Sequence, residues 1–194
     1  MSNNYPDVNK NWINDNNLCW AAASANALVY SGWNHLMGNI TEYQIFDIFK
    51  NSYSPGIMNQ GHRPHTAIDW LLNDYYQLGI PVTDVIQKRS PHDIVLFKED
   101  LSVFRQGGCG ILYIAWDLQR RHSHVITFYD VTVTNSDNDP RSVYTILSVN
   151  SDDHVNQTFN QRLTFDVSKR FYTLNLRGLD GYVFGWWSVQ PYNE

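Results

Sequence analysis

Cysteine is scarce in this sequence of 194 residues: only Cys19 and Cys109 are present, and they form no CxxC pair. Two cysteines are too few for a disulfide framework or a cysteine-rich zinc site, although a single bridge between them remains open. Charged residues are also few, at 17%, and acids outnumber bases to give a formal charge of −5. This balance argues against a nucleic-acid-binding protein, which normally presents a basic surface to phosphates.

Long apolar runs and several enzyme signatures are missing as well. No apolar run approaches the roughly 18–20 residues that span a bilayer, so we expect no membrane segment. The opening MSNNYPDVNKNW lacks the apolar stretch of a signal peptide, so we expect any secretion signal to be absent or already removed. The absence of Gly-X-Ser-X-Gly, HExxH and a phosphate-binding glycine loop argues against a serine hydrolase, a zinc protease and a P-loop enzyme.

Apolar and aromatic residues are abundant instead, at 43% and 14%, so the chain can bury a core. Its length suits one domain over 1–194. Helical periodicity predicts helices over 19–31, 42–50, 65–74 and 91–105, the first of them capped by Asn16 or Asn17. After Gly107, runs of β-branched and aromatic residues predict strands over 109–116, 122–134, 142–150, 162–167, 172–176 and 182–189. The sequence therefore predicts an α+β protein, with N-terminal helices packed on a C-terminal antiparallel sheet.

Cys19 is the first candidate for chemistry, because it stands where a polar loop enters an Ala-rich helix. Unpaired N–H groups and the helix dipole make a helix N-terminus electropositive, which favours a thiolate over a thiol. The small residues that follow allow close packing behind a nucleophile. The alternative is that Cys19 is a small buried residue at the start of an amphipathic helix. We interpret Cys109 likewise as a buried structural residue, within its predicted strand.

His124 is the best-placed base among the seven histidines, because it opens a predicted strand that would hold an imidazole rigidly. His122 competes for this role, and a surface histidine at a strand edge is the other interpretation. Asn150 ends the next predicted strand. In a hairpin the start of the first strand lies opposite the end of the second, so the 135–140 loop should bring His124 and Asn150 together.

The order Cys, His, Asn is that of papain-type proteases. The chain resembles one branch of them, the streptococcal immunoglobulin-degrading cysteine proteases (the IdeS/Mac family), with their spirochaete relative dentipain. The matching residues are Leu18-Cys19 before the Ala-rich helix, HVITFYD from His124, Asn150-Ser151-Asp152, and the ending DGYVFGWWSV. The resemblance covers most of the chain and implies a papain-like fold.

The resemblance implies that Cys19 attacks the scissile carbonyl and that His124 protonates the leaving amine. The family uses an aspartate as the partner of the imidazole, whereas this chain has Asn150, the usual papain choice. Asp152 matches a second carboxylate that supports the site, and Lys10 is the counterpart of an oxyanion-stabilising lysine, although its spacing is one residue short.

The implied function is that of a secreted or cell-surface bacterial virulence protease, monomeric and free of cofactors, that cleaves a protein such as a host immunoglobulin. Two alternatives remain open: deamidation or transglutamination on the same fold, and a non-catalytic binding domain. A zinc site built from His62 and His65, or from His122 and His124, is a weaker alternative, because Pro64 breaks helical spacing and no cysteine pair accompanies them.

Overall fold

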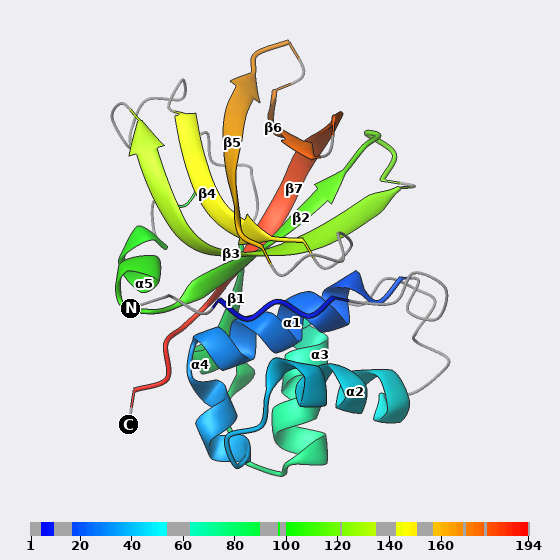
Figure 1. Ribbon diagram of the computed structural model, residues 1–194, viewed down its shortest axis with the longest axis vertical. Coiled ribbons are helices and arrows are strands. Elements are labelled where there is room, and N and C mark those ends of the chain that lie inside the picture. The colour runs from blue at the N-terminus through cyan, green and yellow to red at the C-terminus, as the bar shows by residue number, and fades with distance from the viewer. Residues whose placement is uncertain are drawn as a thin grey trace.

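Helices occupy the first half of the chain and strands the second, as the change of sequence pattern after Gly107 predicts. The computed structural model describes residues 5–9, 17–53, 63–89, 97, 100–120, 122–134, 143–150, 157–168, 170–176 and 178–193. The strands form the upper layer in Figure 1, and most of the helices form a layer beneath them. The α+β class predicted from the sequence is therefore confirmed.

Each predicted helical segment contains helix, although the ends differ, and the short helices over 33–37 and 82–85 were not predicted. The helices are α1 (Cys19–Tyr30), the 3-10 turn η1 (Trp33–Met37), α2 (Glu42–Ser52), α3 (Pro64–Asp69) continued by the π-helical η2 (Trp70–Tyr75), α4 (Val82–Val85) and α5 (Leu101–Arg105). Helix α2 begins with a capping box between Thr41 and Gln44, which satisfies backbone N–H groups at both positions. Gly32, in a left-handed conformation at φ 83°, follows the end of α1, next to the predicted end at residue 31.

Two helix predictions are wrong. Asn17 does not cap α1: it has a left-handed φ of 69°, and Leu18 occupies the cap position without a side-chain hydrogen bond. Asn16 lies outside the described residues. The helix expected over 91–105 is not continuous, because Phe97 has a φ of 60° and α5 begins only at Leu101. A left-handed residue breaks the run of helical dihedral angles whatever the spacing of the apolar side chains.

The strands form a closed barrel, which goes beyond the antiparallel sheet expected. Strands β2 (Cys109–Ala115), β3 (Ser123–Thr134), β4 (Val143–Val149), β5 (Phe159–Asp166), β6 (Phe171–Leu176) and β7 (Leu179–Val189) pair in sequence, each antiparallel to the next. The six-stranded barrel closes because β7 pairs with β6 over its first residues and with β2 over the rest. The short β1 (Ile86–Arg89), which the sequence did not predict, pairs with the end of β7.

Helix α1 lies between the barrel and α2, so it is covered on both sides (Figure 1). Most residues of α1 are buried. Four of the residues from 21 to 25 are alanines, whose small side chains let the helix backbone approach the barrel closely: Ala21, Ala22, Ala23 and Ala25. The structure has two apolar cores as a result. One lies between α1, the other helices and the outer face of the barrel, and the second fills the barrel.

Within the barrel core, Gly110 lies directly against the ring of Phe128, and a Cβ at Gly110 would overlap that ring. Phe128 is fully buried between Phe97 and Phe104, so the ring has no room to move. We expect Gly110→Ala to lower the free energy of unfolding by about 3 kcal/mol, measured by urea denaturation. Gly181→Ala is the matched control, because its Cβ would meet Ile114 at 3.7 Å and the carbonyl oxygen of Leu174 at 3.8 Å, which are ordinary contact distances. Equal losses in both variants would contradict the steric explanation.

The barrel is also joined to the first half of the chain by a buried charge. Asp100 is 1% exposed and accepts hydrogen bonds from Arg89 Nε at 3.1 Å and from Trp186 Nε1 at 2.7 Å. These contacts connect β1, the start of α5 and β7. Trp186 and Trp187 are both buried.

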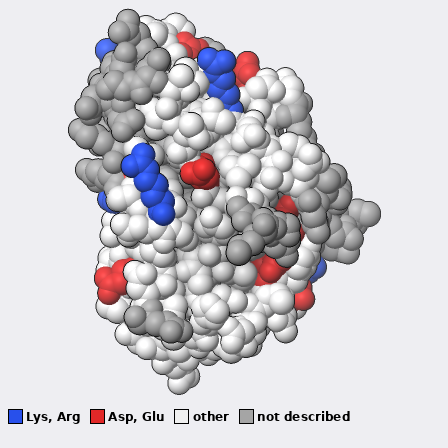
Figure 2. All heavy atoms as spheres, turned by 60° about the vertical axis from the view of Figure 1, so that its left-hand side comes forward, with Lys and Arg blue, Asp and Glu red and all other residues white. Residues whose placement is uncertain are grey.

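The surface carries few charges, as the composition predicts. Figure 2 shows one face on which isolated Lys, Arg, Asp and Glu side chains are scattered among uncharged ones. Across the described residues, no helix combines the length and hydrophobicity that crossing a bilayer requires.

Candidate active site

His124 and Asn150 are in direct contact. His124 is the second residue of β3, Asn150 directly follows β4, and the imidazole Nε2 lies 2.8 Å from Asn150 Oδ1. Both side chains are buried, at 4% and 5% exposure. Because an amide oxygen can only accept a hydrogen bond, Nε2 must carry the proton in this arrangement. The neutral ring then holds its basic lone pair on Nδ1.

The pairing of β3 with β4 explains this contact. Thr127 lies opposite Val149 and Phe128 lies opposite Ser148. Continuing this register places Asn150 opposite Ile126, so Asn150 and His124 are diagonal neighbours on one face of the sheet. The sequence predicted their meeting from the symmetry of the two strands about the 135–140 loop. That loop lies outside the described residues, but the strands that it joins are paired as expected.

A tryptophan packs against the imidazole. The Trp116 ring lies 6.1 Å from the His124 ring between centroids, with an interplanar angle of 25°. His124 is also paired directly with Ile114 across β2 and β3. An aromatic ring and an aliphatic neighbour shield the hydrogen bond to Asn150 from water, which strengthens it. Sequence reasoning missed Trp116, because only the pairing of β2 with β3 reveals that it lies beside His124.

Cys19 is the first residue of α1 and is partly exposed. Helix α1 packs along β3: Thr127 Oγ1 donates to the carbonyl oxygen of Ala23 at 3.2 Å, and the rings of Tyr30 and Tyr129 are 4.5 Å apart. Because residue numbers rise together along both elements, helix and strand run in the same direction. The N-terminus of α1 and the start of β3 therefore lie at the same end of this pair, on the right in Figure 1.

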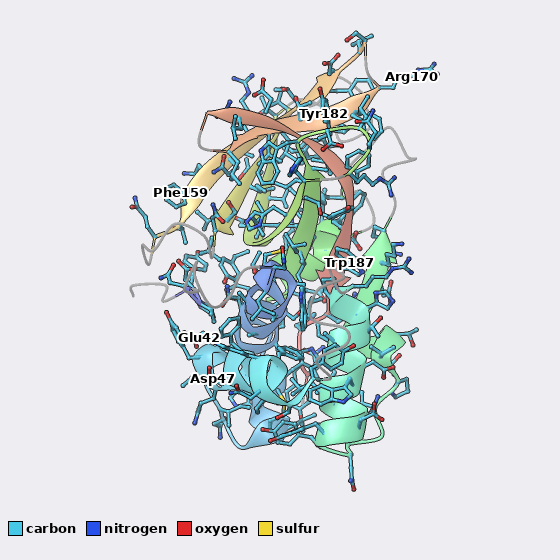
Figure 3. The ribbon with its side chains drawn as sticks, turned by 90° about the vertical axis from the view of Figure 1, so that its right-hand side faces the viewer. Glu42, Asp47, Phe159, Arg170, Tyr182 and Trp187 are labelled. Carbon is cyan, nitrogen blue, oxygen red and sulfur yellow. The ribbon has the colours of Figure 1, made fainter. Side chains whose placement is uncertain are left out.

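The two faces of β3 serve different layers. Val125 and Tyr129 belong to the core shared with α1, whereas Ile126 and Phe128 belong to the core inside the barrel. His124 shares the parity of Ile126, so its ring lies on the barrel side at the end of the strand. Figure 3 looks onto this end of the molecule, with α1 seen nearly end-on beneath the barrel.

The N-terminus of α1 has the electrostatic character expected for a reactive thiol. The helix has no side-chain N-cap and no acidic residue in its first turn. The helix dipole is therefore not opposed by a carboxylate from its own first turn, and a positive helix end favours the thiolate form of cysteine. Cys19 combines this position with partial access to solvent.

Cys109 has the opposite environment. It is fully buried in β2, its Sγ lies 3.3 Å from Ser31 Oγ, and no disulfide joins it to Cys19. Burial raises the pKa of the Cys109 thiol to about 12, since a thiolate loses its hydration there. The single bridge that the sequence left open is therefore not formed, and Cys109 is a structural core residue as expected.

His122, the competing base, lies apart from Asn150. Its side chain is 81% exposed, and Nδ1 lies 3.4 Å from Asp117 in the turn between β2 and β3. Lys10 and Asp152, assigned by resemblance, lie outside the described residues. The segment before Lys10 is anchored, because the Val8 N–H donates to Asn26 Oδ1 of α1 at 3.0 Å.

The zinc alternative finds no support in the described part of the chain, where no three His, Cys, Asp or Glu side chains gather as metal ligands. His65 instead stacks on Trp187, with ring centroids 6.4 Å apart. Burial, with Arg63 and Lys88 nearby, lowers the pKa of His65. His62 lies outside the described residues.

Comparison with known proteins gives no family assignment. No family model matches the chain, and no curated protein matches it by sequence. The functional conclusion therefore depends on the residues and their arrangement.

Proposed function

We propose that this chain is a cysteine endopeptidase of papain-like fold that cleaves a protein substrate through a covalent acyl-enzyme. Cys19 is the nucleophile, His124 the acid and base, and Asn150 the residue that orients the imidazole. The observation that carries the proposal is the buried 2.8 Å hydrogen bond between His124 and Asn150. It fixes the tautomer whose Nδ1 accepts a proton, which is the state that a general base requires.

In this proposal His124 Nδ1 takes the thiol proton of Cys19, and the resulting thiolate attacks the scissile carbonyl carbon. The tetrahedral intermediate collapses as the C–N bond breaks, and the imidazolium returns the proton to the leaving amine. Water then attacks the thioester with His124 as base, which releases the acid product and restores the thiol. Asn150 holds the ring through both steps, and these steps need no cofactor.

The fold supports the proposal, because the thiol stands on a helix packed against a barrel strand that carries the imidazole. Likeness to the immunoglobulin-degrading family remains part of the proposal, with Lys10 as oxyanion donor and Asp152 as a supporting carboxylate. The proposal also includes a host immunoglobulin or another host protein as the substrate, action as a secreted or surface-bound monomer, and the absence of nucleic-acid or membrane partners.

The test is the rate of iodoacetamide alkylation at pH 6, with the labelled peptide identified by mass spectrometry. An ordinary thiol is almost wholly protonated at this pH, so we expect Cys19 to react at least about tenfold faster than free cysteine. His124→Ala should remove this advantage, because the thiolate loses its imidazolium partner. Cys109, whose pKa is about 12, is an internal reference that stays unlabelled.

His122→Ala is the matched control, since it removes an exposed histidine two residues away, and it should leave the alkylation rate unchanged. Slow alkylation of Cys19 in both wild type and His124→Ala would refute the proposal and indicate a binding domain. Fast alkylation together with glutamine deamidation of a protein, without chain cleavage, would instead assign the site to the acyl-transfer alternative.

A further inference from the structure

A row of half-exposed aromatic side chains crosses the outer face of the barrel, and we call it the aromatic strip. It consists of Tyr113 on β2, Phe184 and Tyr182 on β7, and Phe171 on β6. The ring centroids of Tyr113 and Phe184 are 6.1 Å apart, those of Phe184 and Phe171 5.1 Å, and those of Phe171 and Tyr182 6.2 Å. These residues alternate with buried barrel-core residues such as Val183 and Tyr172, so their rings lie outside the barrel.

Tyr113, at one end of the strip, packs against the core shared with the helices, whereas the strip continues over β7 and β6. The helices pack mainly against β1, β2 and β3, and none packs extensively against β6 or β7. Four adjacent aromatic rings in partial contact with water are unusual on a surface, because their burial elsewhere would be favourable. Such a surface suits a partner segment that brings an apolar side chain.

Arg120 adds a positive charge to this strip. Its guanidinium carbon lies 4.4 Å from the centroid of the Phe184 ring, and its side chain is exposed in the turn between β2 and β3. The turn holds Arg120 at a left-handed φ of 60°. No carboxylate among the described residues pairs with it, and the nearby Asp117 is engaged by His122. A guanidinium fixed on an aromatic face keeps its N–H donors for a carboxylate at little further entropic cost.

The strip begins one residue from His124 in the sheet, on the outer face of β3, which packs against α1, the helix that begins at Cys19. Tyr113 pairs directly with Val125, the residue after His124, and Arg120 belongs to the turn that leads into β3. An extended substrate advances about 3.3 Å per residue, so a segment with its scissile bond near His124 would reach Phe184 and Arg120 within a few residues. The strip therefore borders the region that would hold residues flanking the cleaved bond.

We propose that Arg120 determines specificity by binding a carboxylate of the substrate, while the neighbouring apolar side chain of that substrate packs on Tyr113 and Phe184. The substrate class is an extended protein segment with Asp or Glu next to an aromatic or aliphatic residue, close to the scissile bond. This inference rests on the proposed function and goes beyond it, because it names the sequence that the protease selects. Its supports are the exposed guanidinium of Arg120, which lies on the Phe184 ring, and the aromatic strip that continues from that ring.

The test uses internally quenched peptide mixtures with Glu, Gln or Lys fixed at one position and all neighbouring positions randomised. We expect wild type to cleave the Glu mixture about tenfold faster than the Gln mixture, the scale of one charge-assisted hydrogen bond. Arg120→Ala should cleave both equally, and Arg120→Glu should favour Lys. Equal cleavage of Glu and Gln mixtures by wild type, or a Glu preference that survives in Arg120→Ala, would overturn the proposal.

Arg170→Ala is the matched control. Arg170 is also exposed, stands in a turn between barrel strands and has a left-handed φ of 58°. Figure 3 shows it projecting away from the upper end of the barrel. Its removal should leave the preference for Glu over Gln unchanged, so a loss in Arg170→Ala would show that overall charge, rather than the Arg120 site, sets the preference.

A binding measurement separates this inference from the proposed function. Cys19→Ala cannot form the acyl-enzyme, so the anisotropy of fluorescent Glu and Gln mixtures reports binding alone. If no mixture is cleaved by wild type but Cys19→Ala binds Glu peptides through Arg120, the protease proposal fails and the acidic-segment site stands. If peptides are cleaved without dependence on Arg120, the specificity proposal fails and the protease stands.

Discussion

Replacing His124 with alanine is expected to lower kcat/KM for protein cleavage at least about a thousandfold, because the thiol of Cys19 then has no base. Cys19→Ala should give a similar loss. The double variant should be no worse than either single one, since the two groups act as a unit. Asn150→Ala should cost less, about tenfold to a hundredfold, because the imidazole stays but loses its 2.8 Å partner.

Casein cleavage followed by gel and by mass spectrometry gives these rates. His122→Ala is the control for removal of a histidine from the same strand end, and it should retain full activity. The fold of each variant must be checked by circular dichroism and by its thermal midpoint. His124 is buried, and its loss removes a hydrogen-bond donor from the buried amide of Asn150. A folded His124→Ala protein that cleaves casein at the wild-type rate would exclude this histidine as the base.

The second large effect concerns stability. Asp100→Ala is expected to lower the free energy of unfolding by about 3–5 kcal/mol, because it removes the buried acceptor of Arg89 and Trp186 and leaves both donors without it. For a chain of this length the thermal midpoint should fall by about 10 °C. Calorimetry or urea denaturation measures both quantities.

Asp180→Ala is the matched control for Asp100→Ala, because Asp180 is an exposed aspartate that accepts one hydrogen bond from Asn175 at 2.9 Å. We expect it to change the free energy of unfolding by less than about 0.5 kcal/mol. If Asp100→Ala is equally mild, the contacts of Asp100 with Arg89 and Trp186 contribute no net stability, and the connection between β1 and β7 depends on backbone pairing alone.

Local patterns in the sequence predicted the strands and the meeting of His124 with Asn150. Alternation of side chains is a property of each strand by itself, and a hairpin relates two neighbouring strands through a short loop. The contact between His124 and Asn150 therefore needed only the positions of two strands and their antiparallel direction. The proposal of His124 as the base followed from its place at the start of β3, since six other histidines share its residue type.

Long-range relations were not accessible in the same way. Closure of the barrel depends on β7 pairing with both β6 and β2, and the second of these pairings joins residues about 75 positions apart, such as Leu112 and Trp186. The contact of Arg120 with Phe184 is of the same kind. Helix prediction failed at Phe97 because apolar spacing continues through a residue whose backbone is left-handed. The short β1 offers too few residues for a period to be detected.

The separation of thiol and base along the chain has a consequence for synthesis in the cell. Helix α1 leaves the ribosome early, whereas β3 and the end of β4 follow more than a hundred residues later. On the proposed function, the growing chain carries a cysteine without its imidazole for most of translation. Peptidase activity would then appear only when the barrel forms against α1, so an unfinished chain would not cleave the proteins around it.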